Sequence, residues 1–208
     1  MSNLSNLFPV QTVAPLCASK SYALYRETES NVYTLYINDV MEANDLMDLR
    51  HALNDIKSLS LRHPYDYTIK LYIHATAGTY AAYKILFPAL AQHRAHLQAH
   101  IEYAYGYAAV LAMLAKEVTI DVNAVYTLSF TFLTQRISRD DTSIALWIHN
   151  ILKDKLPKET ITAIQAGKTI GFSITELCNL QMVNAVYEND KRIPAKTYVE
   201  SIAGIEKN

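Results

Sequence analysis

Apolar and polar positions along the chain follow two alternating patterns. Residues 32–37, 67–73 and 100–105 are rich in β-branched and aromatic side chains, which is typical of strands. In residues 42–59 the apolar side chains recur at intervals of three and four, which predicts one buried face of an amphipathic helix. A second helix is predicted over residues 79–93. This order of elements predicts an α/β fold with mainly parallel strands and right-handed crossovers.

Shorter segments continue the same alternation towards the C-terminus. Further helices are predicted over 107–116, 142–153, 158–166 and 175–180, and further strands over 118–121, 125–133 and 182–187. Residues 1–30 show no clear period, so they are predicted to form an N-terminal arm. The domain is expected to cover residues 31–187, followed by a C-terminal tail over 188–208.

Composition and charge narrow the classes of protein that fit. Half of the 208 residues are apolar and the formal net charge is -1, which suits a large core and argues against nucleic acid bound through its phosphates. No apolar stretch reaches the length of a membrane-spanning helix. The two cysteines, Cys17 and Cys178, lack the spacing of metal ligands, which favours a reducing compartment. We therefore expect a cytoplasmic protein with no cofactor, no metal, no nucleic-acid partner and no membrane association.

Three segments at the ends of predicted strands resemble a known family in their order and spacing. Residues 73–78 (Ile-His-Ala-Thr-Ala-Gly) and 106–110 (Gly-Tyr-Ala-Ala-Val) each lead from a strand through a turn into a helix, and residues 123–130 lead from a loop into a strand. They resemble the proteolytic subunit of the Clp protease, whose first two motifs are Ile-Asn-Ser-Pro-Gly-Gly and Gly-x-Ala-Ala-Ser. The resemblance covers about residues 30–187. It implies a spiral of β-α-β units, a fold that this family shares with the crotonases.

At the catalytic positions the chain departs from that family. The resemblance places Val110 at the position of the nucleophilic serine and Ser129 at the position of the histidine, and residues 167–172 lack the family's acid. Valine has no hydroxyl for a base to deprotonate, so serine hydrolysis is not expected at this position. Ala77 and Gly78 stand at the turn that helps to form the family's oxyanion hole. The sequence therefore predicts a non-catalytic, Clp-like protein without catalytic residues.

Two enzymatic alternatives stay open. The first is a serine hydrolase with a relocated site around His74 and Ser129. The second is an acyl-CoA enzyme of the crotonase type, in which backbone N–H groups at the turn of Gly106 hold a thioester oxygen without any serine. Such an enzyme usually needs a carboxylate for proton transfer, and Glu102 and Glu117 are the nearest acids in the sequence.

The histidines and tyrosines each allow a structural and a functional interpretation. His93, His96 and His100 are spaced like a metal-binding stripe, but the predicted break between a helix and a strand favours a solvated turn. Many of the fifteen tyrosines lie in predicted strands, where aromatic side chains normally fill half-buried sheet positions. An aromatic binding surface is the alternative.

Assembly is the role that the resemblance implies for a subunit without catalysis. Trp147, Ile148 and Ile151 lie in a predicted helix that matches the family's subunit contacts, and a Trp beside aliphatic residues is a common interface anchor. Packing of this helix on its own domain is the alternative. We expect a homo-oligomer, with a ring as its family-like form, and a protein partner such as a Clp subunit or an unfoldase. The expected location is the cytoplasm of a bacterium, or of one infected by a virus that encodes the chain.

Overall fold

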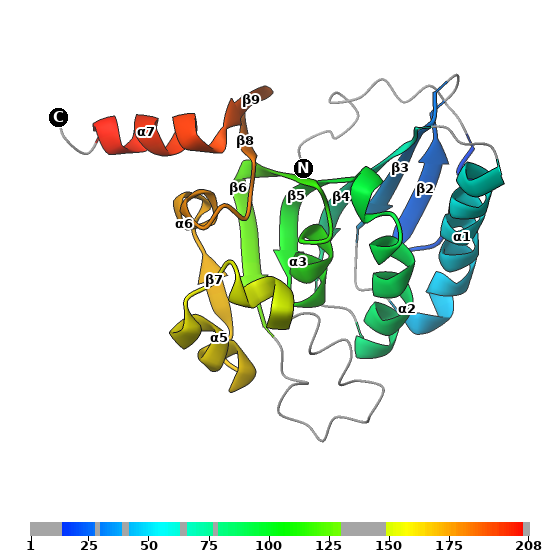
Figure 1. Cartoon of the computed structure of the whole chain (residues 1–208), viewed down its shortest axis with the longest axis horizontal. Coiled ribbons are helices and arrows are strands. Elements are labelled where there is room, and N and C mark those ends of the chain that lie inside the picture. Colours follow the sequence, from blue (N-terminus) through cyan, green and yellow to red (C-terminus); the bar gives the residue numbers. More distant parts are fainter. Residues whose placement is uncertain are drawn as a thin grey trace.

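The computed structural model describes residues 14–27, 30–38, 42–62, 66–76, 79–129 and 149–205, without the side chains of Asp45 and Ile205. These residues form one sheet in the order β1-β2-β3-β4-β5-β6-β8-β9, with β7 also paired to β6 (Figure 1). The strands are β1 (Cys17–Ala18), β2 (Tyr22–Arg26), β3 (Val32–Ile37), β4 (Thr68–Ala75), β5 (Leu97–Tyr105), β6 (Glu117–Leu128), β7 (Ile170–Phe172), β8 (Ala185–Glu188) and β9 (Lys191–Pro194). The α-helices are α1 (Met47–Arg62), α2 (Tyr80–Ala91), α3 (Tyr107–Ala112), α5 (Lys158–Gln165), α6 (Ile174–Asn179) and α7 (Ala195–Ile205).

Strands β3 to β6 form the parallel centre of the sheet, which confirms the predicted fold class. Ile37, Ile73, Ile101 and Ile120 pair in register as a row across these strands, and each is at most 1% exposed. Burying one such side chain stabilises the fold by roughly 1.5–3 kcal/mol. The row also fixes the register, because a slip by one residue would turn a strand's apolar side chains to the other face.

Helices α1, α2 and α3 cover the face of the sheet on which this row lies (Figure 1). α1 buries Leu49, Leu53 and Ile56, which follow the three- and four-residue spacing of one helix face. α2 begins after Thr79, whose hydroxyl accepts the N–H of Ala82 and so caps the helix. All residues of α3 are buried, so packing rather than intrinsic propensity holds this short helix.

The opposite face of the sheet carries polar and aromatic side chains. Along β4 the buried Leu71 and Ile73 alternate with Lys70, Tyr72 and His74, which are half-buried or exposed. Successive side chains of a strand point to opposite faces, so one strand supplies both the core and this second surface. We refer to the side away from α1, α2 and α3 as the polar face.

Two segments that the sequence analysis placed outside the domain contribute strands to the sheet. β2, within the predicted arm, pairs with β3 in antiparallel orientation and buries Tyr22 and Leu24. β9, within the predicted tail, pairs with β8, and α7 contacts this hairpin and α6. A strand of five residues such as β2 offers too few positions for a period to stand out in the sequence.

β6 replaces the two strands predicted over 118–121 and 125–133. It is one strand of 12 residues, but its pairing with β5 is irregular. Ile120 lies opposite Ile101, and the next residue of β6 that pairs with β5 is Val125. Residues 121–124 of β6 therefore do not pair with β5, at the point where the sequence predicts a break between two strands.

Several predicted roles fall on residues outside the described part of the chain. These residues are Ala77, Gly78, Trp147 and Ile148. Of the predicted assembly residues, Ile151 is described, and it is half-buried in a helical segment over residues 149–153. Within the described residues, no helix is both long and apolar enough to cross a membrane.

Candidate functional site

Gly106 turns the chain from β5 into α3, where the sequence analysis expects backbone groups to bind an oxygen. Its φ of 62° and ψ of -116° lie in a region that residues with a Cβ rarely adopt. Its N–H donates to the carbonyl of Thr127 over 2.8 Å, which fastens the turn to β6. The Gly106 amide is therefore engaged, and α3 begins directly after this turn at the carboxyl end of β5.

Val110 fills the position that the Clp resemblance gives to the nucleophilic serine. Its side chain is fully buried in α3, and Ala109 and Leu111 beside it are buried as well. The hydroxyl of Tyr126 donates to the carbonyl of Ala109 over 3.0 Å and ties this helix to β6. A shift of the alignment by one residue therefore still offers only apolar core side chains, and serine chemistry has no nucleophile here.

Ser129, at the family's histidine position, directly follows β6 and lies near the hydroxyl groups of Thr169 and Tyr105. Its Oγ lies 2.9 Å from Oγ1 of Thr169. Hydrogen bonds from Ser129 and Thr169 lower the pKa of Tyr105, at the end of β5. Among the described residues, no hydrogen bond joins Ser129 to a histidine or a carboxylate. His74 lies on β4 and contacts Glu102 instead. The structure therefore does not bring together the two residues of the relocated hydrolase.

His74 and Glu102 form an ion pair near the carboxyl ends of β4 and β5. The His74 Nδ1 and the Glu102 Oε2 are 3.1 Å apart, and the two side chains are 59% and 25% exposed. The pairing of β4 with β5 shifts between Ile73 and His74, so that His74 lies opposite Tyr103 and Glu102 is the extra residue of a bulge. Such bulges re-aim side chains and are frequent beside active sites.

Glu117, the second acid considered in the sequence, lies at the other end of the sheet. It is the first residue of β6 and is opposite Gln98, near the start of β5. Its Oε1 accepts a hydrogen bond from the guanidinium of Arg192 on β9. Because β5 and β6 are parallel, Glu117 lies at the end of these strands that is remote from the Gly106 turn. Of the two acids, Glu102 lies nearer to that turn.

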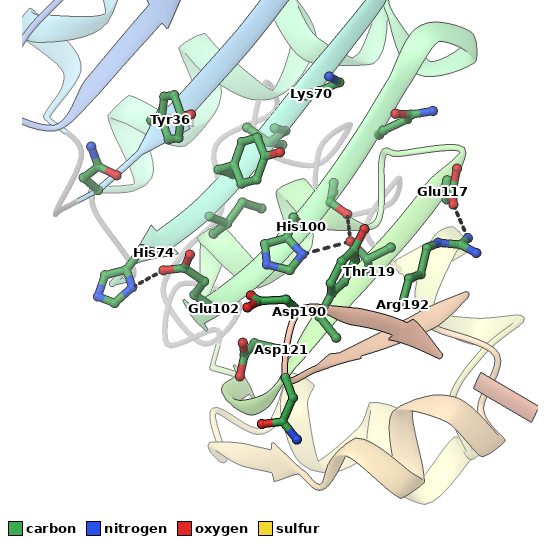
Figure 2. Close-up of a pocket in the computed structure, with 18 residues that line it drawn as sticks. Tyr36, Lys70, His74, His100, Glu102, Glu117, Thr119, Asp121, Asp190 and Arg192 are labelled. Atoms are coloured by element: carbon green, nitrogen blue, oxygen red, sulfur yellow. Dashed lines mark hydrogen bonds and ion pairs between the residues drawn. The ribbon is translucent and has the colours of Figure 1, made fainter. Parts of the chain in front are cut away.

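A cavity of about 420 Å³ opens on the polar face, beside the β8–β9 hairpin (Figure 2). His74 and Glu102 line it at one end, and Glu117 and Arg192 line it at the other. Residues of the central strands and of the β8–β9 hairpin form its walls. A volume of this size accommodates a small organic ligand.

His100 is held in one tautomer on the wall of this cavity. Its Nδ1 lies 2.9 Å from Oγ1 of Thr119, and the hydroxyl of Thr119 donates to the carbonyl of Ala99 over 3.2 Å. A hydroxyl carries one proton, so Nδ1 of His100 is the donor and Nε2 is left as an acceptor. Burial lowers the pKa of His100, against the opposing effect of Glu102 and Asp121, so the ring is neutral near pH 7.

Aromatic rings continue from His100 in both directions along the cavity. The ring of Tyr72 lies 5.6 Å from His100 on one side, and Tyr187 lies 5.2 Å away on the other, edge to face. Tyr36 stacks on Tyr72 at 5.1 Å. Burial raises the pKa of Tyr36 and Tyr72, so both hydroxyls stay protonated. The sequence analysis missed His100 as a cavity residue, although its alternation with Glu102 on one strand was a usable signal.

No family model and no curated protein matches this chain. A monofunctional enoyl CoA isomerase from M. smegmatis matches with a TM-score of 0.57 and 14% identity, over 91% of this chain and 84% of that one. An enoyl-CoA hydratase from Polaromonas sp. JS666 matches with 0.57 and 17%, over 88% and 76%. One from Mycobacterium avium subsp. paratuberculosis K-10 matches with 0.57 and 15%, over 92% and 79%. The chain has a crotonase-type fold.

The crotonase-type fold confirms one part of the sequence-based resemblance and leaves another unsupported. The predicted spiral of β-α-β units is the fold that the Clp subunit and the crotonases share. The matches above are enoyl-CoA hydratases and an isomerase, and at 14–17% identity they show the fold alone. They lend no support to a peptidase relative that has lost its activity or to a viral origin.

The solvated turn predicted for the histidines is wrong for His93. This side chain is fully buried. Its Nδ1 lies 2.7 Å from the hydroxyl of Tyr67, and its Nε2 lies 3.1 Å from the carbonyl of Leu53. The carbonyl can only accept, so Nε2 carries the proton, and burial lowers the pKa of His93 to about 4. In the described part of the chain, no group of His, Cys, Asp or Glu has the arrangement of a metal site.

Proposed function

We propose that this chain is an enzyme of the crotonase type that acts on acyl-CoA thioesters. The observation that carries the proposal is the fully buried Val110 at the serine position of a crotonase-type fold. A peptidase cannot work without that nucleophile, whereas thioester chemistry of this type needs only donors to the carbonyl oxygen and a group that moves a proton.

The β5–α3 turn supports the first requirement. Gly106 has a conformation that a residue with a Cβ would strain, and the first backbone N–H groups of α3, like those of any helix, have no partner within the helix. Donors fixed before the reaction polarise a thioester carbonyl without reorganising during it. The second turn of the predicted oxyanion site, at Ala77 and Gly78, stays a prediction.

The ion pair of Glu102 and His74 supports the second requirement. Glu102 would take a proton from water or from the carbon next to the polarised carbonyl, and it would return that proton in the following step. The 3.1 Å contact with Nδ1 of His74 holds the carboxylate of Glu102 in place. Glu102 lies on β5, the strand whose carboxyl end leads into the Gly106 turn.

Turnover of acyl-CoA esters tests the proposal directly. We expect the purified chain to hydrate or isomerise at least one member of a series of enoyl-CoA esters of increasing chain length. We also expect the same esters to raise the thermal unfolding temperature, because a ligand that binds only the folded state stabilises it. Absence of both effects across the series would overturn the proposal.

The same sample distinguishes the two other hypotheses. The relocated hydrolase requires covalent labelling by a fluorophosphonate probe that is lost in Ser129→Ala, and we expect no labelling. A native mass measurement gives the oligomeric state, because the predicted homo-oligomer and its protein partner stay predictions. A defined oligomer without any turnover would favour the non-catalytic subunit.

A further inference from the structure

The cavity on the polar face has a composition that the proposed acyl-CoA chemistry does not explain. It runs from His74 and Glu102, near the carboxyl ends of β4 and β5, to Arg192 on the β8–β9 hairpin (Figure 2). Its lining includes His100, Thr119, Asp121, Tyr187 and Asp190, and none of them has a part in the proposed reaction. Their hydrogen-bonding capacity indicates what kind of ligand the cavity accepts.

The two cationic side chains in the wall are already paired with carboxylates. Nζ of Lys70 lies 3.0 Å from Oε1 of Glu27. The guanidinium of Arg192 donates to Glu117. Each cation thus already has a carboxylate partner, and the lining holds four carboxylates against these two cations, so the cavity favours a cationic ligand over an anionic one.

The other polar groups in the cavity wall are mainly hydrogen-bond acceptors. Asp121 accepts the backbone N–H of Asn123 over 2.8 Å, and it forms no ion pair with any described residue. Asp190, in the turn between β8 and β9, likewise pairs with no cation among the described residues. His100 adds Nε2 as a third acceptor, because Thr119 fixes its proton on Nδ1. Figure 2 shows the imidazole of His100 between Thr119 and Glu102.

The aromatic wall provides the complementary apolar surface. Tyr187 stands edge to face against His100, with ring centroids 5.2 Å apart. The faces of tyrosine rings attract cations, and a desolvated contact of this kind contributes about 1–2 kcal/mol. A cavity of about 420 Å³ has room for a ring as well as a charged group.

From this combination we propose that the polar-face cavity binds an organic ammonium ion that carries N–H donors and a planar aromatic part. The ammonium would donate to Asp121, Asp190 and Nε2 of His100, and the aromatic part would lie against Tyr187. His74 and Glu102 line the same cavity, but the ammonium would contact neither these two residues nor the Gly106 turn, so the inference does not depend on the proposed function. It develops the aromatic binding surface that the tyrosine-rich strands allowed as an alternative.

Calorimetric titration of the full chain with two indole compounds of opposite charge tests this inference. Tryptamine carries an ammonium group and indole-3-propionate carries a carboxylate, while the ring is the same. We expect saturable 1:1 binding of tryptamine, and binding of indole-3-propionate that is at least about tenfold weaker, since opposite charges on one scaffold differ chiefly in their electrostatic interaction. No acyl-CoA is present, so either proposal can fail without the other.

Three variants locate the binding of tryptamine. Asp121→Asn should weaken it about fivefold, because a partly exposed ion pair contributes up to about 1 kcal/mol. His100→Phe keeps an aromatic ring but removes the acceptor, and it should weaken binding about threefold. Asp48→Asn makes the same change as the first variant on α1, which packs on the other face, and it should leave the affinity unchanged. Equal binding of both compounds, no binding of tryptamine, or no effect of Asp121→Asn in a variant that melts like the wild type would overturn the proposal.

Discussion

The two faces of the sheet are made by alternate residues of the same strands, and they differ in almost every property. The helix-covered face carries a fully buried row of isoleucines. Val110, in the covering helix α3, stands where the Clp family has its nucleophilic serine and is also fully buried. The polar face carries His74, His100 and Glu102, the cavity and the ion pairs. The first face determines the fold and the second carries the candidate chemistry. The effects of substitutions along one strand should therefore alternate between stability and function.

The largest expected effect lies on the helix-covered face. Ile101→Ala should lower the free energy of unfolding by about 2–5 kcal/mol, because it removes buried methyl groups and leaves a cavity. Gln98→Ala, on the other face of the same strand, should change it by no more than about 0.5 kcal/mol. Urea denaturation measures both values. Similar losses in the two variants would show that the faces do not differ in stability as described.

The free energy of unfolding, measured as a function of pH, tests the effect of the buried His93. His93 has an ordinary pKa of 6.5 in the unfolded chain and a pKa of about 4 in the folded one, so the unfolded state binds the proton first as the pH falls. Stability should therefore fall by about 3 kcal/mol between pH 6.5 and pH 4. His93→Gln should flatten this slope in the unfolding curves. An unchanged slope would assign the acid sensitivity to other groups.

The Gly106 turn gives the next smaller effect. Gly106→Ala should cost about 1–3 kcal/mol of stability, because its positive φ strains any residue with a Cβ. Gly171→Ala is the control, since a Cβ there meets Oγ1 of Thr127 at an ordinary contact distance of 3.8 Å. Thermal denaturation should show a clear loss only for Gly106→Ala. Equal losses would contradict the special role of this turn.

The smallest effect is expected for an ion pair on the polar face. Lys70→Ala breaks the contact with Glu27, in which the two side chains are 35% and 44% exposed. Such pairs contribute about 0.2–1 kcal/mol, and salt screens them. The difference in unfolding free energy from the wild type should be at the low end of this range and should shrink in high salt. A loss as large as that of Ile101→Ala would be inconsistent with a solvated surface.

The helix-covered face was predictable from the sequence because periodicity reports burial directly. The spacing in α1 and the alternation in β3, β4 and β5 were enough to predict the parallel centre of the sheet. The short strands β1, β2, β7 and β9 were not predicted, because each pairs with a partner that local sequence does not reveal.

The candidate site was predictable only in part. The absence of a serine nucleophile followed from Val110 alone. The choice between Glu102 and Glu117 required strand direction, which places them at opposite ends of the sheet. The pairing of Glu102 with His74 depends on a bulge, and the burial of His93 depends on Tyr67. These are tertiary contacts between residues at least 26 positions apart, which periodicity does not encode.

The ratio of kcat/KM between two matched variants tests the central proposal most directly. Glu102→Gln and Glu117→Gln make the same chemical change at opposite ends of the polar face. With an enoyl-CoA ester that the wild type converts, Glu102→Gln should lower kcat/KM by about 100-fold or more, because a general acid–base group contributes on that order. Glu117→Gln should stay within about threefold of the wild type, because the residue acts only in a surface ion pair. Equal activity of both variants would contradict the assignment of proton transfer to Glu102.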